Sequence, residues 1–195
     1  MEIIQQKKIR KVLNISIFGD SNTGKTQIIR SLLGETFDEP SPTSGSYKYI
    51  LRLKNPEIIL KLIDTPGQER YREIVFDSLD HSQGAVLVFN LTNRETFLNL
   101  PNWLNEVKKN KNLAIILFGN ACEDIRRVIT REEAENIAKK YNLSYFEVSA
   151  MKNINIKSGF KSLVNEIIEQ SLQQYENSNS KRFKNKPLLY KYINF

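Results

Sequence analysis

Positions 19–26 carry residue types and spacing that suit a loop for binding phosphate. The run Gly19-Asp20-Ser21-Asn22-Thr23-Gly24-Lys25-Thr26 fits the pattern G-x-x-x-x-G-K-[ST]. Gly19 and Gly24 allow backbone angles that a side chain would forbid, so the loop can turn its N–H groups inward onto an anion. Lys25 adds a positive charge for terminal phosphates, and the Thr26 hydroxyl is suited to Mg²⁺. Asn22 stands where a second glycine is common, and asparagine tolerates positive φ better than most residues.

A second polar stretch, Asp64-Thr65-Pro66-Gly67-Gln68, follows the apolar run at 58–63. Asp64 offers carboxylate oxygens, the kind of ligand that a hard cation such as Mg²⁺ prefers. An Asp-x-x-Gly pattern taken alone is compatible with an ordinary turn. Its position after a phosphate-binding loop favours a functional site instead.

Alternating strands and helices must position these residues. The hydrophobic periodicity predicts strands at 11–18, 47–53, 58–63, 85–89, 113–118 and 145–148, and helices at 25–33, 94–109, 131–141 and 155–175. A hairpin turn is expected at 55–56 and a weaker helix from about 70 to 79. This alternation predicts an α/β fold with a mostly parallel sheet, in which ligands bind beyond the carboxyl ends of the strands. The loops 19–26, 64–68, 119–124 and 149–151 each follow a strand, so all four are expected at that edge.

Composition bounds the class of protein. The 195 residues are enough for one domain with a full core. No apolar run approaches the ~18 residues of a membrane span, and the polar start does not resemble a signal peptide. The lone cysteine, Cys122, cannot form an internal disulfide and fits a reducing compartment. We interpret it, together with His81 and Trp103, as structural.

The net charge of +7 is concentrated at the two ends of the chain. Residues 1–11 carry +3 and residues 181–195 carry +5, so residues 12–180 sum to −1. A nearly neutral body argues against nucleic-acid binding by the domain. The basic ends are expected to be solvated tails, with contact to anionic lipid or to an acidic partner as the alternative.

Taken together, these motifs resemble the small GTPases of the Ras superfamily, and among them the Rab branch. The resemblance covers about residues 11–172. The segments that carry it are Gly19-Asp20-Ser21, Gln68-Glu69-Arg70-Tyr71-Arg72 and Phe118-Gly119-Asn120 with Cys122. It implies a small G domain with the three-layer P-loop NTPase fold, in which helices cover both faces of a six-stranded, mostly parallel sheet. It also implies a molecular switch that binds GTP, GDP and Mg²⁺ and slowly hydrolyses GTP to GDP and phosphate.

The resemblance assigns roles to individual residues. Gln68 would orient the attacking water, and the Gly67 N–H would bind the γ-phosphate. Thr26, Thr43 and Asp64 would hold Mg²⁺. Phe37 would pack against the edge of the purine, although a core position after the first helix is an equal alternative. The implied nucleotide contacts are Gly19, Asp20, Ser21, Asn22, Thr23, Gly24, Lys25, Thr26, Gln27, Phe37, Thr43, Gly67, Asn120, Ala121, Glu123, Asp124, Ser149, Ala150 and Met151.

Two base-reading segments depart from the family pattern. The usual Asn-Lys-x-Asp is here Asn120-Ala121-Cys122-Glu123, with Asp124 next, so either carboxylate is a candidate to accept hydrogen bonds from guanine. Ala121 lacks the lysine whose stem covers the base. The usual Ser-Ala-Lys is here Ser149-Ala150-Met151; the Ala150 N–H can bind the guanine O6, and Met151 can supply apolar cover. We expect a guanine preference with weaker binding and faster exchange than in a typical Rab.

Two functions remain open at this stage. The first is a GTP-hydrolysing switch in vesicle trafficking or signalling, with an exchange factor, a GTPase-activating protein and effectors as partners. The second is a degenerate Rab-like interaction module that binds nucleotide weakly and acts as a scaffold. The expected organisation is a basic leader at 1–10, a G domain at 11–175 and a basic, aromatic tail at 176–195 without a prenylation cysteine. A cytoplasmic monomer, peripheral at most to an endomembrane and not bound to nucleic acid, is expected.

Overall fold

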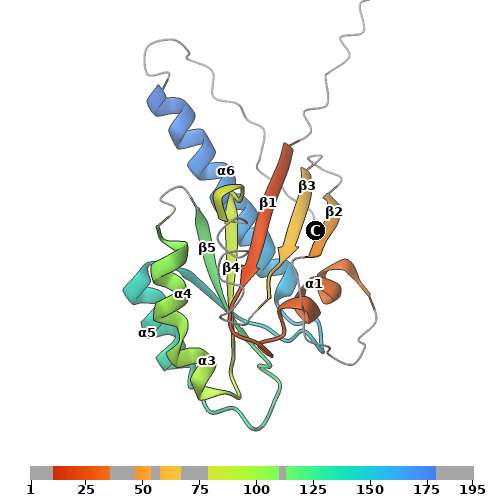
Figure 1. The fold of residues 1–195 in the computed structure, drawn as a ribbon, viewed down its shortest axis with the longest axis vertical. Helices are drawn as coiled ribbons and strands as arrows, with labels where there is room; N and C mark the ends of the chain where they lie inside the picture. Colours follow the sequence, from red (N-terminus) through yellow and green to blue (C-terminus); the bar gives the residue numbers. More distant parts are fainter. Residues whose placement is uncertain (1–10, 36–46, 54–57, 67–78, 110–112, 179–195) are drawn as a thin grey trace, which may run out of the picture.

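Strand β1 (Lys11–Phe18) lies inside the sheet and pairs with a strand on each side (Figure 1). A computed structural model describes residues 11–35, 47–53, 58–66, 79–109 and 113–178. The other strands are β2 (Tyr47–Leu53), β3 (Ile58–Asp64), β4 (Gly84–Asn90), β5 (Ala114–Asn120) and β6 (Ser144–Glu147). Their order is β2-β3-β1-β4-β5-β6; β2 runs antiparallel to β3, and the remaining pairings are parallel. The six-stranded, mostly parallel sheet is therefore confirmed.

Helices cover both faces of this sheet and make the fold three-layered. They are α1 (Lys25–Leu33), α3 (Arg94–Leu98), α4 (Leu100–Val107), α5 (Arg131–Tyr141) and α6 (Ile156–Ser178). One buried apolar cluster joins α1 and α6 to the sheet through residues such as Ile28 and Phe160. A second cluster joins α3, α4 and α5 to the opposite face through residues such as Leu104 and Ala134. Figure 1 shows α3, α4 and α5 gathered on one side of the sheet.

The single helix expected at 94–109 is wrong, because the chain forms two helices that meet at Asn99. Pro101 lies in the first turn of α4, and its nitrogen has no hydrogen to donate to the carbonyl of Phe97. The carbonyl of Asn99 instead accepts the N–H groups of Asn102 and Trp103 and so begins the second helix. This junction faces the phosphate-binding loop, as described below.

Some expected segments lie outside the described residues. They are the leader at 1–10, the hairpin turn at 55–56, nearly all of the helix expected near 70–79, and positions 179–195 of the tail. Among the residues that are described, no helix combines the length and apolar character needed to cross a lipid bilayer.

Candidate functional site

The loop between β1 and α1 adopts the backbone shape that an anion-binding loop requires. Gly19, Asn22 and Gly24 all have positive φ, of 135°, 61° and 89°. The value at Asn22 confirms that asparagine serves where a glycine is common. A Cβ atom on Gly19 would lie 2.0 Å from the carbonyl oxygen of Val88, so this glycine also permits a close backbone approach. Gly24 caps α1 with no side-chain hydrogen bond, which leaves the positive end of the helix available to an anion.

Lys25 is folded back over this loop. Its Nζ atom donates hydrogen bonds to the carbonyl oxygens of Gly19 at 2.9 Å and Asp20 at 2.8 Å. The residue is 7% exposed, and burial lowers the pKa of its ammonium group to about 8, although the nearby carboxylates of Asp64 and Asp20 oppose the shift. The lysine is thus held beside the loop by two carbonyl groups, in a position to meet an incoming phosphate.

Thr26 and Asp64 form the oxygen-rich part of the site. The Thr26 hydroxyl donates to Oδ2 of Asp64 at 2.5 Å, which joins the start of α1 to the end of β3. Asp64 is fully buried, and this burial raises the pKa of its carboxyl group against the opposing effects of Thr26 and Lys25. Its other oxygen, Oδ1, is buried and has no hydrogen-bond partner among the described residues. A buried carboxylate oxygen beside a hydroxyl is a donor set that fits Mg²⁺.

Asn120 joins the phosphate-binding loop to the two loops expected to read the base. Its Nδ2 atom donates to the carbonyl of Thr23 at 2.9 Å, and its Oδ1 atom accepts from the Ala150 N–H at 3.1 Å. The side chain is 8% exposed, so both hydrogen bonds are shielded from water. These contacts, with that between Thr26 and Asp64, bring the four predicted loops to one edge of the sheet.

The two candidate carboxylates after Asn120 differ in their surroundings. Arg126 donates to both oxygens of Asp124, from its backbone N–H and its guanidinium, and holds the pKa of that carboxyl at about 2. Oε2 of Glu123, in contrast, is buried and has no hydrogen-bond partner in the described part of the chain. Glu123 therefore has the carboxylate oxygen that is available to a new donor.

Ala121 and Met151, the two positions where the family pattern has lysine, lie in the loops predicted to read the base. Ala121 has φ of 65° and only a methyl side chain, and Met151 is 65% exposed. Ser149 is buried, and its hydroxyl oxygen accepts from the Lys152 N–H at 2.9 Å.

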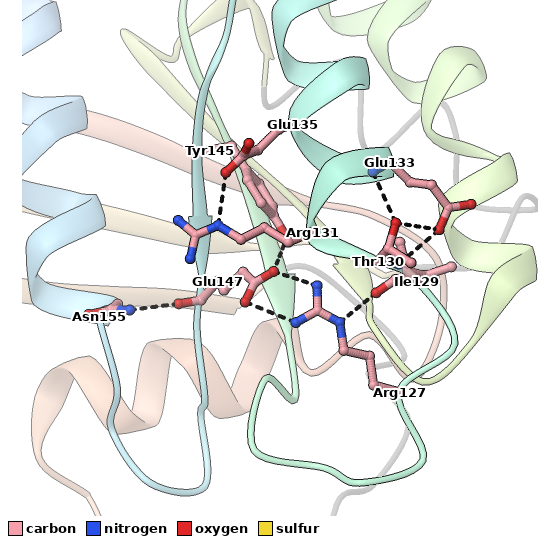
Figure 2. Close-up of polar contacts among 9 residues, drawn as sticks. All are labelled: Arg127, Ile129, Thr130, Arg131, Glu133, Glu135, Tyr145, Glu147 and Asn155. Atoms are coloured by element: carbon pink, nitrogen blue, oxygen red, sulfur yellow. Dashed lines mark hydrogen bonds and ion pairs between the residues drawn. The ribbon is translucent and has the colours of Figure 1, made fainter.

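A polar network that the sequence analysis did not identify supports these loops. Figure 2 shows Arg127 paired through both terminal nitrogens with the carboxylate of Glu147, at 3.0 and 2.5 Å. The Nε atom of Arg127 also donates to the carbonyl of Ile129, and Asn155 donates to the carbonyl of Glu147. The ion pair thus connects the loop after Asn120 to the strand that precedes Ser149. No local pattern signals it, since its partners are 20 residues apart.

Four predicted site residues lie outside the described part of the chain: Phe37, Thr43, Gly67 and Gln68. Of the remaining nucleotide contacts, Ser21 and Asn22 are exposed in the loop, whereas Thr23 and Gln27 are buried. The structure therefore brings the residues predicted to bind phosphate and Mg²⁺ together, and the loops predicted to read the base lie beside them.

Comparison with known proteins decides the family. The model of the Ras family matches residues 14–169, which is most of the chain. The chain belongs to the Ras family of small GTPases. The chain is 33% identical over 166 residues to the Ras-related protein Rab11A of Lotus japonicus, covering 82% of this chain and 74% of the relative. It is 32% identical to RABA4b of Arabidopsis thaliana, with the same coverage, and 29% identical over 163 residues to Rab-13 of Rattus norvegicus, covering 80% of each chain.

These similarities confirm the Rab-like small GTPase that the motifs predicted, and with it GTP hydrolysis as the activity of this Ras-family protein. Ras-family proteins generally bind guanine nucleotide with Mg²⁺ and work with exchange factors, activating proteins and effectors.

Proposed function

We propose that this GTPase is a Rab-like molecular switch in vesicle trafficking or signalling, which adopts different surfaces with GTP and GDP. The observation that carries the proposal is the assembled phosphate region, in which Lys25, Thr26 and Asp64 are buried or joined by hydrogen bonds at the carboxyl ends of β1 and β3. A protein that used the fold only as a scaffold would not need a buried lysine and a buried carboxylate there, because both are costly to bury.

Each residue has a defined task in this proposal. Lys25 and the N–H groups at the start of α1 bind the terminal phosphates. Thr26 and Asp64, together with Thr43, hold Mg²⁺, which when bound neutralises charge on the phosphate oxygens. Gln68 orients the attacking water, the Gly67 N–H binds the γ-phosphate, and Phe37 packs on the purine. The Ala150 N–H and Glu123 bind guanine; the engagement of Asp124 by Arg126 makes Glu123 the better candidate.

The alternative function is a Rab-like interaction module that binds nucleotide weakly. Ala121 and Met151 favour it, because they replace the two lysines of the family pattern and Ala121 has no stem to cover the base. The two functions differ in the predicted affinity for nucleotide and not in the fold.

We also propose a G domain spanning 11–175 between a basic leader and a basic tail. In this proposal the protein is a cytoplasmic monomer that does not bind nucleic acid, and the tail at 176–195 gives at most weak, reversible contact with an endomembrane.

The deciding experiment is titration of nucleotide-free protein with fluorescent GDP, GTP, ADP and ATP, each with and without Mg²⁺. Tight, Mg²⁺-dependent binding of guanine nucleotides alone supports the switch; weak or unselective binding supports the scaffold. Gln68→Leu then tests hydrolysis, since its single-turnover rate should fall below that of the wild type while GTP affinity is retained. An unchanged rate would remove Gln68 from the mechanism.

A further inference from the structure

The side chain of Asp20, in the phosphate-binding loop, is bound to the junction of α3 and α4. Its Oδ2 atom accepts a hydrogen bond from Nδ2 of Asn99 at 2.8 Å, and its Oδ1 atom accepts from Nε1 of Trp103 at 2.7 Å. Both carboxylate oxygens are thus engaged by neutral donors that lie about 80 residues further along the chain. Hydrogen bonds to a charged acceptor are stronger than those between neutral groups.

The backbone of the same residue positions Lys25. The carbonyl oxygen of Asp20 accepts hydrogen bonds from Nζ of Lys25 at 2.8 Å and from the hydroxyl of Thr23 at 3.0 Å. Fixing the Asp20 side chain therefore also fixes one of the two carbonyl groups that hold the lysine. A displacement of Asp20 would move the charge that meets the phosphates.

The donors are themselves held in place. The Trp103 ring stacks on Phe18, the buried last residue of β1, with ring centroids 6.5 Å apart. Asn99 ends α3 and begins α4, and its carbonyl oxygen accepts from two N–H groups of the following turn. The break between the two helices thus places two side-chain donors opposite Asp20.

Electrostatics gives a reason for this arrangement. A carboxylate in a loop that binds phosphate repels the anion that the loop must hold, and the repulsion is strong where water is partly excluded. Two donors bonded to the carboxylate disperse its charge and restrict where it can turn. We propose that Asn99 and Trp103 are positioning residues for the nucleotide phosphates, which act by holding the Asp20 side chain against the α3–α4 junction. This inference rests on the nucleotide-binding function proposed above.

The test is a double-mutant comparison of GDP release. Trp103→Phe keeps an aromatic ring to pack on Phe18 but deletes the indole N–H, and Asn99→Leu deletes the other donor. Each is made in the wild-type background and in Asp20→Ala, and the dissociation of fluorescent GDP is measured. In the wild-type background each should accelerate release by about threefold to tenfold, which is less than the full loss of a hydrogen bond to a charged group because the effect reaches the phosphates through Asp20. In the Asp20→Ala background the same substitutions should change the rate less than about twofold. Asn102→Leu, an exposed position on α4, is the matched control.

A second readout does not depend on nucleotide. Trp103 is the only tryptophan in the sequence, so its indole N–H gives a single resonance in a nitrogen–proton spectrum. That resonance should move in Asp20→Ala and stay in place in Asn102→Leu; an unmoved resonance in Asp20→Ala overturns the proposal.

The two proposals fail in different ways. Equal acceleration of GDP release in both backgrounds would show that Asn99 and Trp103 merely support the helices, and would overturn the positioning role alone. A wild-type chain that binds no guanine nucleotide would overturn the proposed function and the positioning role with it, even where the indole resonance still reports the contact.

Discussion

The side-chain nitrogen of Asn120 lies 2.9 Å from the carbonyl oxygen of Thr23, a residue 97 positions earlier in the chain. Through its other atom the same amide accepts the N–H of Ala150. One buried side chain therefore joins the loop predicted to bind the phosphates to both loops predicted to read the base. An acceptor on the base, such as the guanine O6, that binds the Ala150 N–H must share it with Asn120.

Asn120→Ala should weaken nucleotide binding without unfolding the protein. The substitution leaves a buried carbonyl and a buried N–H without their partner, at a cost of about 1–3 kcal/mol each. We expect GDP to dissociate at least about tenfold faster, measured with a fluorescent analogue. Asn105→Ala, an exposed asparagine on α4, is the control and should leave the rate unchanged. A rate for Asn120→Ala within twofold of wild type would contradict the bridging role.

Gly19→Ala should abolish nucleotide binding and lower the free energy of unfolding by about 3 kcal/mol or more. The new Cβ atom would lie 2.0 Å from the backbone oxygen of Val88, at a φ of 135°. Gly34→Ala is the matched control: its φ is 77°, but a Cβ atom there meets nothing within 4 Å. Gly34→Ala should lower the free energy of unfolding by about 1 kcal/mol, from backbone strain alone, and leave GDP affinity intact. Urea unfolding measures the loss of stability in each variant, and GDP titration measures the loss of affinity. Equal losses of GDP affinity in the two variants would contradict the role of the close approach between Gly19 and Val88.

Burial of Lys25 predicts a specific pH dependence of stability in the nucleotide-free, Mg²⁺-free protein. Its folded pKa is about 8, below the ordinary value of 10.5, so between these values the unfolded chain binds a proton that the folded chain does not. The wild type should therefore gain stability relative to Lys25→Met as the pH rises from about 8 to 10.5, by up to about 1.4 kcal/mol per unit. Below pH 8 the difference should be constant. Urea unfolding of both proteins at several pH values measures it, and a difference that does not change with pH would contradict this account of the buried lysine.

The sequence predicted the strands and helices, and the edge of the sheet where the site loops gather, better than it predicted the side-chain contacts between those loops. Strong periodicity located the described strands and helices, except that α3 and α4 were merged into one helix, and the mostly parallel sheet followed from their alternation. The break at Asn99 was missed although Pro101 was visible, because proline is tolerated in the first turn of a helix and its presence does not say where a new helix begins. The local sequence motifs were enough to identify Lys25, Thr26 and Asp64 as candidate site residues.

The partners of Asp20, Asn120 and Arg127 could not be predicted in this way. Each partner is brought close by the tertiary fold, from 20 to 97 positions away, and side-chain hydrogen bonds leave no period in the sequence. Trp103 was interpreted as structural, and its ring stacks on Phe18, but its N–H bond to Asp20 depends on a rotamer that only packing fixes.

Arg127→Ala should destabilise the protein by about 2 kcal/mol, because it leaves the partly buried Glu147 without its cation. The side chains of this pair are 27% and 16% exposed, whereas those of Arg131 and Glu135 are 71% and 40% exposed. Arg131→Ala is therefore the control and should cost no more than about 0.5 kcal/mol. Equal losses for the two variants in urea unfolding would show that burial of the pair adds nothing.

The same pair has a pH signature. Burial alone would raise the pKa of Glu147, but the hydrogen bonds and charge of Arg127 outweigh it and hold the pKa below the ordinary 4.5. The stability that the pair supplies is therefore fully present above pH 4.5 and is lost as the pH falls through the lowered pKa. The difference in the free energy of unfolding between wild type and Arg127→Ala should become smaller below that pH. A difference that becomes larger in acid would contradict this account of the ion pair.

Restoring the family's lysine at position 121 should slow nucleotide release, and this test bears on the choice between switch and scaffold. Ala121 already has φ of 65°, so a longer side chain adds no new backbone strain there. A lysine stem would cover the base, and its ammonium would reach the phosphate-binding loop. We expect Ala121→Lys to reduce the rate of GDP dissociation by about tenfold, the value of one charge-assisted hydrogen bond.

Ile125→Lys is the control: it places the same charge in the same loop at a side chain that is 98% exposed, and it should leave the rate of GDP dissociation unchanged. If both variants slowed GDP dissociation equally, the effect would come from the added positive charge at long range and not from a contact with the base or the phosphate-binding loop. An unchanged rate of GDP dissociation in Ala121→Lys would mean that the small residue does not limit nucleotide affinity. The longer side chain of Glu123 would then be the remaining candidate cause of weak binding.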